Sequence, residues 1–524
     1  MGFYKNAGKK RKIMDKIIVL DFGSQYSHLI CRRIRESNVY CELLPYNTPI
    51  KTIMDLNPKG IIFSGGPASV YEINSPKPDK KIFELNIPIL GICYGQQIIV
   101  DHYRGKIKRV DNREYGNALL KIKDKNNLFK NIQADDIQCW MSHSDAAEIL
   151  PYGFDILAET NNSISAAIGN AKKKIFGIQF HPEVVHTQNG FDILNNFSHI
   201  ISEAKSEWTM NNFIDSIIEN IKSKIGTEKV LCAVSGGIDS TTAAVLIHRA
   251  IGENLTCVFV NNGLLRQDEE FHVMELFNET LRIPVKYLDA QKRFLNKLKG
   301  VSDPEDKRKL IGEEFARVFT EFAEEEGPFQ WLAQGTLYPD VIESGVSRGP
   351  ATVIKTHHNV GGLPDWLNLK VIEPLRDLYK DEVRKVAKIL KIPSELLKRH
   401  PFPGPGLAVR ILGELSDEKI RITKKASKIV EDVLVEDNIY DKVWQAYAMV
   451  GDDKAVGILG DERIYGHIVT VRIVESIDAM TADWVRIPYI TLEKISSKIT
   501  NEVENVTWVT YAISSKPPST IEPQ

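Results

Sequence analysis

A cysteine between glycines is the first residue of this chain that could do covalent chemistry. Cys93 lies in the segment Gly91-Ile92-Cys93-Tyr94-Gly95, after a short apolar run and before a segment of helical character. Flanking glycines permit a sharp strand-to-helix turn that would expose the thiol above the end of the strand. At a helix N-terminus a thiolate is a stabilised nucleophile, and nearby N–H groups can receive an oxyanion. From these residues alone, a small buried cysteine in a glycine turn is an equally good interpretation.

A histidine and a glutamate two residues apart form the second candidate. In the segment Gly177-Ile178-Gln179-Phe180-His181-Pro182-Glu183, an extended backbone would place the side chains of His181 and Glu183 on the same side. A base beside an orienting carboxylate is the arrangement of a catalytic triad. By itself His-Pro-Glu is more typical of a loop, so the inference depends on this segment and Cys93 belonging to one sheet.

A loop of small residues is the third candidate. The run Ser235-Gly236-Gly237-Ile238-Asp239-Ser240-Thr241 follows an apolar strand-like segment and precedes a helical one. Small residues allow backbone N–H groups to close on an anion at the positive end of a helix. The loop lacks the lysine of a Walker motif. Asp239 could hold Mg²⁺ between phosphates, or an Asp or Ser of the loop could simply cap the helix.

Alternating strands and helices are predicted around all three segments. We expect strands at residues 17–20, 61–63, 88–90, 230–234 and 255–260, and helices at 27–36, 241–251, 307–326 and 380–390. This rhythm is typical of α/β folds with parallel sheets, in which ligands bind at the carboxyl ends of the strands. Cys93 and the small-residue loop each follow such a strand, and His181 and Glu183 lie on an extended segment.

The order of predicted strands and helices along the chain indicates three domains. Residues 15–206 and 207–400 are predicted to form two consecutive parallel-sheet α/β domains, and the proline cluster at 401–405 marks the second boundary. Residues 401–524 read as a smaller α+β C-terminal domain. A length of 524 residues is consistent with this number of domains.

Composition excludes several classes of function. The formal net charge is -2, from 67 basic and 69 acidic residues, which gives no support for a general affinity for nucleic acid. We find no apolar run long enough to span a bilayer and expect no membrane partner. The six cysteines form no C-x-x-C pair, so a reducing, cytoplasmic location is expected.

The first block resembles the class I glutamine amidotransferases. The resemblance is carried, in order, by Asp21–Tyr26, Ser64–Pro67, Gly91–Gln97 and Phe180–Val184. It implies a glutaminase that forms glutamate and ammonia through a γ-glutamyl thioester.

The same resemblance implies roles for individual residues. Cys93 would be the nucleophile, His181 the general base and acid, and Glu183 the residue that orients His181. Backbone N–H groups of Gly66 and Tyr94 would form the oxyanion hole.

The rest of the chain resembles the N-type ATP pyrophosphatases and, more narrowly, the glutamine-hydrolysing GMP synthases. The motifs are Phe259–Arg266, Lys307–Gly312, Gln334–Ser344, Lys355–Pro364, Pro403–Arg410, Met480–Trp484 and Ser515–Glu522. The family implies a ligase of the EC 6.3.5 type that uses glutamine, ATP and XMP. Adenylated XMP would react with ammonia to give GMP, with pyrophosphate and AMP as the other products.

Ligand residues follow from this resemblance. The family implies ATP binding by Ser235, Gly236, Gly237, Ile238, Asp239, Ser240, Thr241, Lys355 and Lys380, XMP binding by Arg308, Lys516 and Glu522, and Mg²⁺ at Asp239. An ordinary surface helix position is the alternative for Lys380 and for Arg308, and a frayed tail is the alternative for Lys516 and Glu522. The third domain is expected to pair two chains as a homodimer.

Some positions depart from the family pattern. Asn261 replaces a usual Asp near the ATP strand, Trp508 and Ala512 stand in a segment that usually reads Arg-Val-Val-Tyr-Asp, and Pro523-Gln524 replaces Trp-Glu. These changes bear on nucleotide binding. Two other functions are therefore considered: an amidotransferase-ligase acting on another acceptor, and a non-catalytic nucleotide-binding regulator with the same fold.

Overall fold

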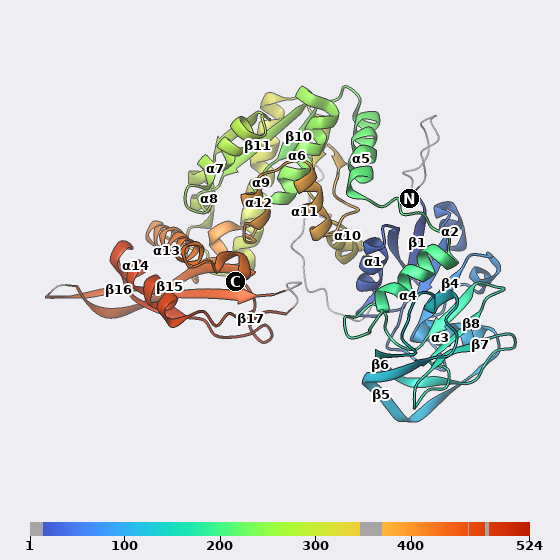
Figure 1. Cartoon of the computed structure of the whole chain (residues 1–524). Helices are drawn as coiled ribbons and strands as arrows, with labels where there is room; N and C mark the ends of the chain where they lie inside the picture. The colour runs from blue at the N-terminus through green and yellow to red at the C-terminus, as the bar shows by residue number, and fades with distance from the viewer. Residues whose placement is uncertain (1–13, 346–368, 460, 477–480) are drawn as a thin grey trace. The chain divides into compact units, whose positions relative to one another are not determined.

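The polypeptide divides into two compact units after Phe213. This computed structural model describes residues 14–345, 369–459, 461–476 and 481–524, and Figure 1 shows the elements in order along the chain. The predicted fold class is confirmed: two α/β sheets are followed by a smaller α+β module.

The first unit is built on one mixed sheet. Its strand order is β2-β1-β3-β4-β9-β8-β7-β5-β6. Pairing is parallel from β2 to β9 and antiparallel from β9 to β6. The strands are β1 (Lys16–Asp21), β2 (Tyr40–Pro45), β3 (Gly60–Phe63), β4 (Ile89–Ile92), β5 (Lys106–Ile122), β6 (Asp136–Ile149), β7 (Asp155–Glu159), β8 (Ala167–Asn170) and β9 (Ile175–Ile178).

Both faces of this sheet are covered. Alternate residues of β1 enter different apolar clusters: Ile17 and Val19 belong to one, and Ile18 and Leu20 to the other. A strand that is buried on both faces must be apolar throughout. This explains the continuous apolar run at residues 17–20 from which the strand was predicted. The helices are α1 (Ser27–Glu36), α2 (Ile50–Leu56), α3 (Tyr94–His102) and α4 (Gly190–Asn196), with short turns η1 (Lys80–Glu84), η2 (Asn127–Phe129) and η3 (Phe197–Ile201).

The second unit begins with a parallel sheet. Its order is β12-β11-β10-β13-β14, and every pair is parallel. The strands are β10 (Val230–Ala233), β11 (Leu255–Asn261), β12 (Val285–Asp289), β13 (Trp331–Ala333) and β14 (Lys370–Ile372). The helices and turns are α5 (Met210–Ile225), in which the division between the units falls, α6 (Ile238–Ile251), η4 (Gly252–Asn254), α7 (Glu269–Glu275), η5 (Leu276–Thr280), α8 (Gln291–Leu298), α9 (Pro304–Glu326), α10 (Tyr338–Gly345), α11 (Lys380–Ile389) and α12 (Ser394–Lys398).

The chain ends in a sheet packed against two helices. In this sheet β16 pairs antiparallel with β15 and β17 and parallel with β18. One apolar cluster runs from Leu231 to Val506, so this module shares a core with the parallel sheet, and the boundary at residue 400 stays a prediction. The elements are η6 (Gly406–Arg410), α13 (Asp417–Glu436), η7 (Tyr440–Lys442), β15 (Gln445–Leu459), β16 (Glu462–Glu475), β17 (Asp483–Trp484), α14 (Tyr489–Glu502) and β18 (Val506–Tyr511).

Candidate active sites

Cys93 occupies the turn from β4 into α3. Its φ is +52°, a left-handed value that is costly for a residue with a side chain and is found where function requires it. The glycines are needed because backbones touch here: a Cβ on Gly91 would lie 2.4 Å from the Gly95 oxygen, and one on Gly95 would lie 2.5 Å from the Phe63 oxygen. The Cys93 N–H donates to Ile178 O of β9 at 2.7 Å, which anchors the turn. The spacing of the motif therefore has a steric cause.

His181 and Glu183 form a buried pair on the segment that follows β9. Nδ1 of His181 lies 2.7 Å from Oε1 of Glu183, and the two residues are 4% and 0% exposed. A Cβ on Gly65 would lie 3.2 Å from Cε1 of His181 and 3.7 Å from Cβ of Cys93, so both residues border the same point. The parallel pairing of β4 with β9 brings the two motifs together.

The environment of His181 favours its protonated form. Burial opposes the charge and would lower the pKa, but the Glu183 carboxylate and the Cys93 sulfur outweigh it and raise the pKa of His181 to about 10. The His181 imidazole can therefore carry a proton beside the Cys93 sulfur and act as a proton donor.

Further groups around the sulfur were not anticipated from the sequence. Nε2 of Gln179 donates to the Cys93 sulfur at 3.7 Å, and the thiol in turn lies 3.7 Å from Ser142 O. Thr187 Oγ1 donates to His181 O at 2.6 Å and fixes the histidine backbone. Residues two apart on an extended segment point to the same side, and this rule, which predicted Glu183, also applies to Gln179, two residues before His181. No sequence pattern near Ser142 or Thr187 indicates that they lie at the site.

The predicted oxyanion donors lie in the residue that follows the cysteine and in the turn that follows β3. Tyr94 is the first residue of α3, so its N–H lacks an acceptor within the helix. Gly66 follows β3, the strand next to β4, where a Cβ would lie 2.7 Å from Phe22 O. Their catalytic role stays a prediction.

The small-residue loop joins β10 to α6 in the second unit. Gly236 has φ +71° and Gly237 is the N-cap of α6. Internal hydrogen bonds order the loop: Gly237 N donates to Ser235 Oγ at 3.3 Å, and Ser240 Oγ donates to Gly237 O at 3.2 Å. Ser235 and Gly237 are exposed, so the positive end of α6 is accessible to an anion.

Asp239 and Lys380 meet beside this loop. Lys380 is the first residue of α11, and its Nζ donates to Asp239 Oδ2. The other oxygen, Oδ1, is buried and has no hydrogen-bond partner among the described residues. Gly335 closes this side, where a Cβ would lie 3.3 Å from the Asp239 backbone. A buried carboxylate oxygen without a donor is suited to a cation.

The predicted XMP ligands are brought to the C-terminal tail. Nη2 of Arg308, on α9, donates to Gln524 O at 2.6 Å. Glu522 accepts both hydrogen bonds of a bidentate pair with Arg410. Lys516 pairs through its backbone with Ala482, in a short bridge. The tail is thus docked against the second unit and is not frayed.

Lys355 and its whole segment lie outside the described residues. Nothing in the structure bears on its predicted role at ATP.

The positions that depart from the family pattern have defined surroundings. Asn261 is 3% exposed, accepts from Gly263 N at 2.9 Å and donates to Tyr287 OH at 2.9 Å, a combination that an ionised Asp cannot make. Trp508 is 55% exposed on β18 and donates to Val456 O. Ala512 donates its N–H to Val471 O. Nothing in the structure explains Pro523, whereas the side chain of Gln524 accepts from Lys307.

The described residues contain neither a membrane-spanning helix nor a cluster of metal-binding side chains. Within them, no helix is long and apolar enough to cross a bilayer. No group of three or more His, Cys, Asp and Glu side chains in the same ranges is arranged to hold a metal ion.

Family models match three consecutive parts of the chain. The glutamine amidotransferase class-I model matches residues 18–201, the NAD synthase model residues 209–314, and the GMP synthase C terminal domain model residues 432–523. The first two matches contain Cys93, His181 and the loop at 235–241.

Curated relatives match over nearly the full length. The chain is 50% identical over 521 residues to the GMP synthase [glutamine-hydrolyzing] of Gloeothece citriformis, covering 98% of this chain and 96% of the relative. It is 52% identical over 507 residues to the protein of the same name from Caldicellulosiruptor saccharolyticus, covering 97% and 99%. Among solved structures, a glutamine amidotransferase from Thermotoga maritima is 18% identical and covers 40% of this chain and 85% of its own, with a TM-score of 0.28.

Proposed function

Because the chain belongs to the family of glutamine-hydrolysing GMP synthases, we propose that its catalytic groups are divided between a glutaminase site in the first unit and an adenylating site in the second. The protein is a ligase of the EC 6.3.5 type that makes GMP from XMP, ATP and glutamine. The observation that carries the division is the Cys93, His181 and Glu183 constellation in one unit and the open loop before α6 in the other.

In the glutaminase site, Cys93 attacks the side-chain amide carbon of glutamine. The negative charge that develops on the amide oxygen is received by the N–H groups of Gly66 and Tyr94. His181 gives its proton to the leaving nitrogen, which departs as ammonia and leaves a γ-glutamyl thioester on the cysteine. His181 then takes a proton from the incoming water, and glutamate is released. Glu183, at 2.7 Å, keeps the imidazole oriented and stabilises its charge.

In the adenylating site, the loop at 235–241 receives the phosphates of ATP. O2 of XMP attacks the α-phosphorus and pyrophosphate leaves, which turns O2 into part of a good leaving group. Ammonia then attacks C2 of the purine, and AMP departs with that oxygen to leave GMP. Backbone N–H groups of Gly237 and its neighbours, together with Lys380, stabilise the charge on the phosphates. Lys355 is proposed to act at ATP from the family pattern alone.

Asp239 is the protein group that fits Mg²⁺. Its Oδ1 is a buried carboxylate oxygen without a donor among the described residues, and magnesium commonly combines one or two carboxylates with substrate phosphates and water. The ion, when bound, would neutralise phosphate charge. The short contact of Oδ2 with Lys380 fixes the orientation of the carboxylate.

XMP is proposed to bind near the docked tail. Arg308 supplies a guanidinium for the nucleotide phosphate, and Lys516 and Glu522 supply a cation and an acceptor. Support comes from their place in the family pattern and from the approach of Arg308 to the tail, 2.6 Å from Gln524 O.

A homodimer in the cytoplasm is proposed. Large apolar side chains are exposed where β15, β16 and β18 meet: Ile458 is 80%, Tyr465 68% and Trp508 55% exposed. Exposed apolar surface of this kind is typical of an interface. All six cysteines are buried and none is paired in a disulfide, which suits a reducing compartment.

The test is GMP formation from XMP, Mg-ATP and either glutamine or ammonium chloride, with the wild-type chain and Cys93→Ala. We expect the wild type to form GMP from both nitrogen sources. The variant should form it only from ammonium, since Cys93 acts only on glutamine. Loss of both activities in the variant would give Cys93 a structural role, and absence of GMP in the wild type, with glutaminase intact, would contradict the XMP assignment.

A further inference from the structure

Arg410 is a buried guanidinium that the proposed reaction does not use. It lies at the end of η6 and is 1% exposed. Its guanidinium carbon lies 4.3 Å from the centre of the Tyr447 ring and 4.9 Å from the centre of the Phe402 ring. Since a buried charge is costly unless it is paired and hydrogen-bonded, its partner is informative.

That partner is Glu522 of the tail, 112 residues further along the chain. Nε and Nη2 of Arg410 donate to the two carboxylate oxygens at 3.1 and 2.9 Å. Nε2 of Gln445 donates to Oε1 at 2.6 Å. The carboxylate is therefore held by donors from η6 and from β15.

The pairing leaves Glu522 capacity for one ligand. A carboxylate has about four lone-pair positions. Within the described residues Oε1 accepts two hydrogen bonds and Oε2 accepts one. The side chain is 17% exposed, so Oε2 can accept a further bond from a donor on a purine nucleotide, a ring N–H or a ribose hydroxyl.

The tail backbone reaches this position by a second set of contacts. Arg472 donates from Nε to Ile521 O at 3.0 Å and from Nη2 to Thr520 O at 2.8 Å. Tyr447 OH donates to Ile521 O at 2.6 Å. These bonds fix the residues before Glu522, whereas Arg410 fixes its carboxylate.

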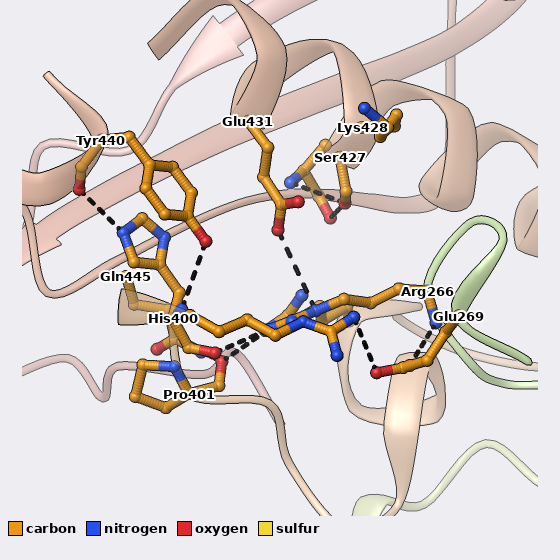
Figure 2. A network of polar contacts seen from close by, with 12 residues as sticks. Arg266, Glu269, His400, Pro401, Ser427, Lys428, Glu431, Tyr440 and Gln445 are labelled. Carbon is orange, nitrogen blue, oxygen red and sulfur yellow. Dashed lines mark hydrogen bonds and ion pairs between the residues drawn. The ribbon is translucent and has the colours of Figure 1, made fainter. Parts of the chain in front are cut away.

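The same network reaches the loop that follows β11. Pro401 O accepts from Gln445 Nε2 at 3.1 Å and from Arg266 Nη2 at 3.3 Å, and Figure 2 shows Arg266 beside His400 and Pro401. The Arg266 guanidinium lies 4.7 Å from the Phe402 ring. The donors that hold Glu522 are thus built into the fold of the second unit and are not mobile surface groups.

We propose that Arg410 is a positioning residue for nucleotide recognition: it holds the Glu522 carboxylate, together with Gln445, so that Oε2 presents one acceptor to a donor of XMP. The inference rests on the proposed place of Glu522 at XMP. Its chemistry requires arginine, because the planar fork serves both carboxylate oxygens at once and an ammonium group cannot.

The test compares Arg410→Lys, Glu522→Gln and the double variant in the full chain. Pyrophosphate release is measured with ammonium chloride as the nitrogen source while XMP is varied at saturating Mg-ATP. We expect Arg410→Lys to raise the KM for XMP about tenfold and to change kcat less than about threefold, because an acceptor for the substrate is misplaced and the reacting atoms are not. The KM for ATP should stay unchanged.

The double variant separates positioning from general stability. If Arg410 acts through Glu522, Arg410→Lys adds little to the KM for XMP once Glu522 is Gln. Multiplied effects, or an unchanged KM for XMP in Arg410→Lys, would overturn the proposal. A wild type without XMP-dependent pyrophosphate release would instead count against the proposed function.

Two further variants serve as a matched control and as a substitute in case Arg410→Lys does not fold. Arg421→Lys, at a half-exposed arginine of α13 that lies 3.7 Å from Glu504, is the matched control and should keep the wild-type KM. If Arg410→Lys does not fold, judged by thermal unfolding, Gln445→Leu withdraws the other donor to Glu522 Oε1 and should raise the KM about threefold. A wild-type KM in Gln445→Leu would then contradict the proposal.

Discussion

Replacing Glu183 by Gln tests the glutaminase site at its most buried charge. The substitution keeps the size of a side chain that is 0% exposed and removes the carboxylate that lies 2.7 Å from Nδ1 of His181. Because burial lowers the pKa of His181 and the carboxylate raises it, the pKa in the variant should fall well below about 10. The proton needed by the leaving ammonia is then held less firmly.

The size of the effect follows from that pKa. The difference between about 10 and the ordinary 6.5 corresponds to a net preference of about 5 kcal/mol for the protonated imidazole, which remains after burial has opposed the combined contributions of Glu183 and Cys93. A loss of about 4 kcal/mol from the transition state would lower glutaminase kcat/KM about 10³-fold. The alkaline limb of the pH profile, set by His181 near 10 in the wild type, should move to lower pH.

The assay is glutamate release in the presence of XMP and Mg-ATP, with ammonium-dependent GMP formation measured in parallel. Only glutamate release should fall, because the second unit does not contain Glu183. Glu203→Gln, at an exposed carboxylate of the first unit that pairs with Lys174, is the matched control. Glutaminase activity within about tenfold of wild type, with an unmoved alkaline limb, would refute the reasoning.

Three other substitutions or conditions have defined outcomes. Asp239→Ala should lower pyrophosphate release about 10³-fold with either nitrogen source, and unchanged release would remove Asp239 from the mechanism. Gly406→Ala should lower the urea midpoint by an amount worth about 3 kcal/mol, since φ is +66° and a Cβ would lie 2.3 Å from Leu264 O; a wild-type midpoint would show that the loop yields. Burial and two nearby arginines lower the pKa of His400 to about 4, so the unfolded chain binds the proton first as pH falls. His400 should therefore contribute a drop of about 3 kcal/mol in unfolding free energy between pH 6.5 and 4, and His400→Leu, followed by urea unfolding, should show a total drop smaller by that contribution.

Local patterns predicted the elements that carry the first site. The helix expected at 27–36 is α1 within the same limits, and the strands expected at 61–63 and 88–90 are β3 and β4 within about two residues. Glycine spacing around Cys93 has an equally local cause, since backbones touch at Gly91 and Gly95. Such features depend on neighbours in the sequence, which is why the sequence was sufficient.

Features that depend on contacts between residues far apart in the chain could not be predicted from local sequence patterns. The alternation of strands with helices predicts parallel strands only. It does not predict the antiparallel half of the first sheet, in which the long strands β5 and β6 follow each other and pair directly. Arg410 meets Glu522 across 112 residues, and neither residue type indicates the other. The C-terminal module shares its core with the parallel sheet, so a change of rhythm near residue 400 does not by itself define a separate compact unit.

The two units differ in how much of the chain each needs before its core is complete. Among the described residues, two apolar clusters of the first unit lie between Ile17 and Ala204, whereas one cluster of the second unit joins Leu231 to Val506. Since domains fold in order as they leave the ribosome, the first unit has its full core when less than half of the protein has been made. The first unit can therefore reach a complete core on the nascent chain well before the residues that complete the core of the second unit have been made.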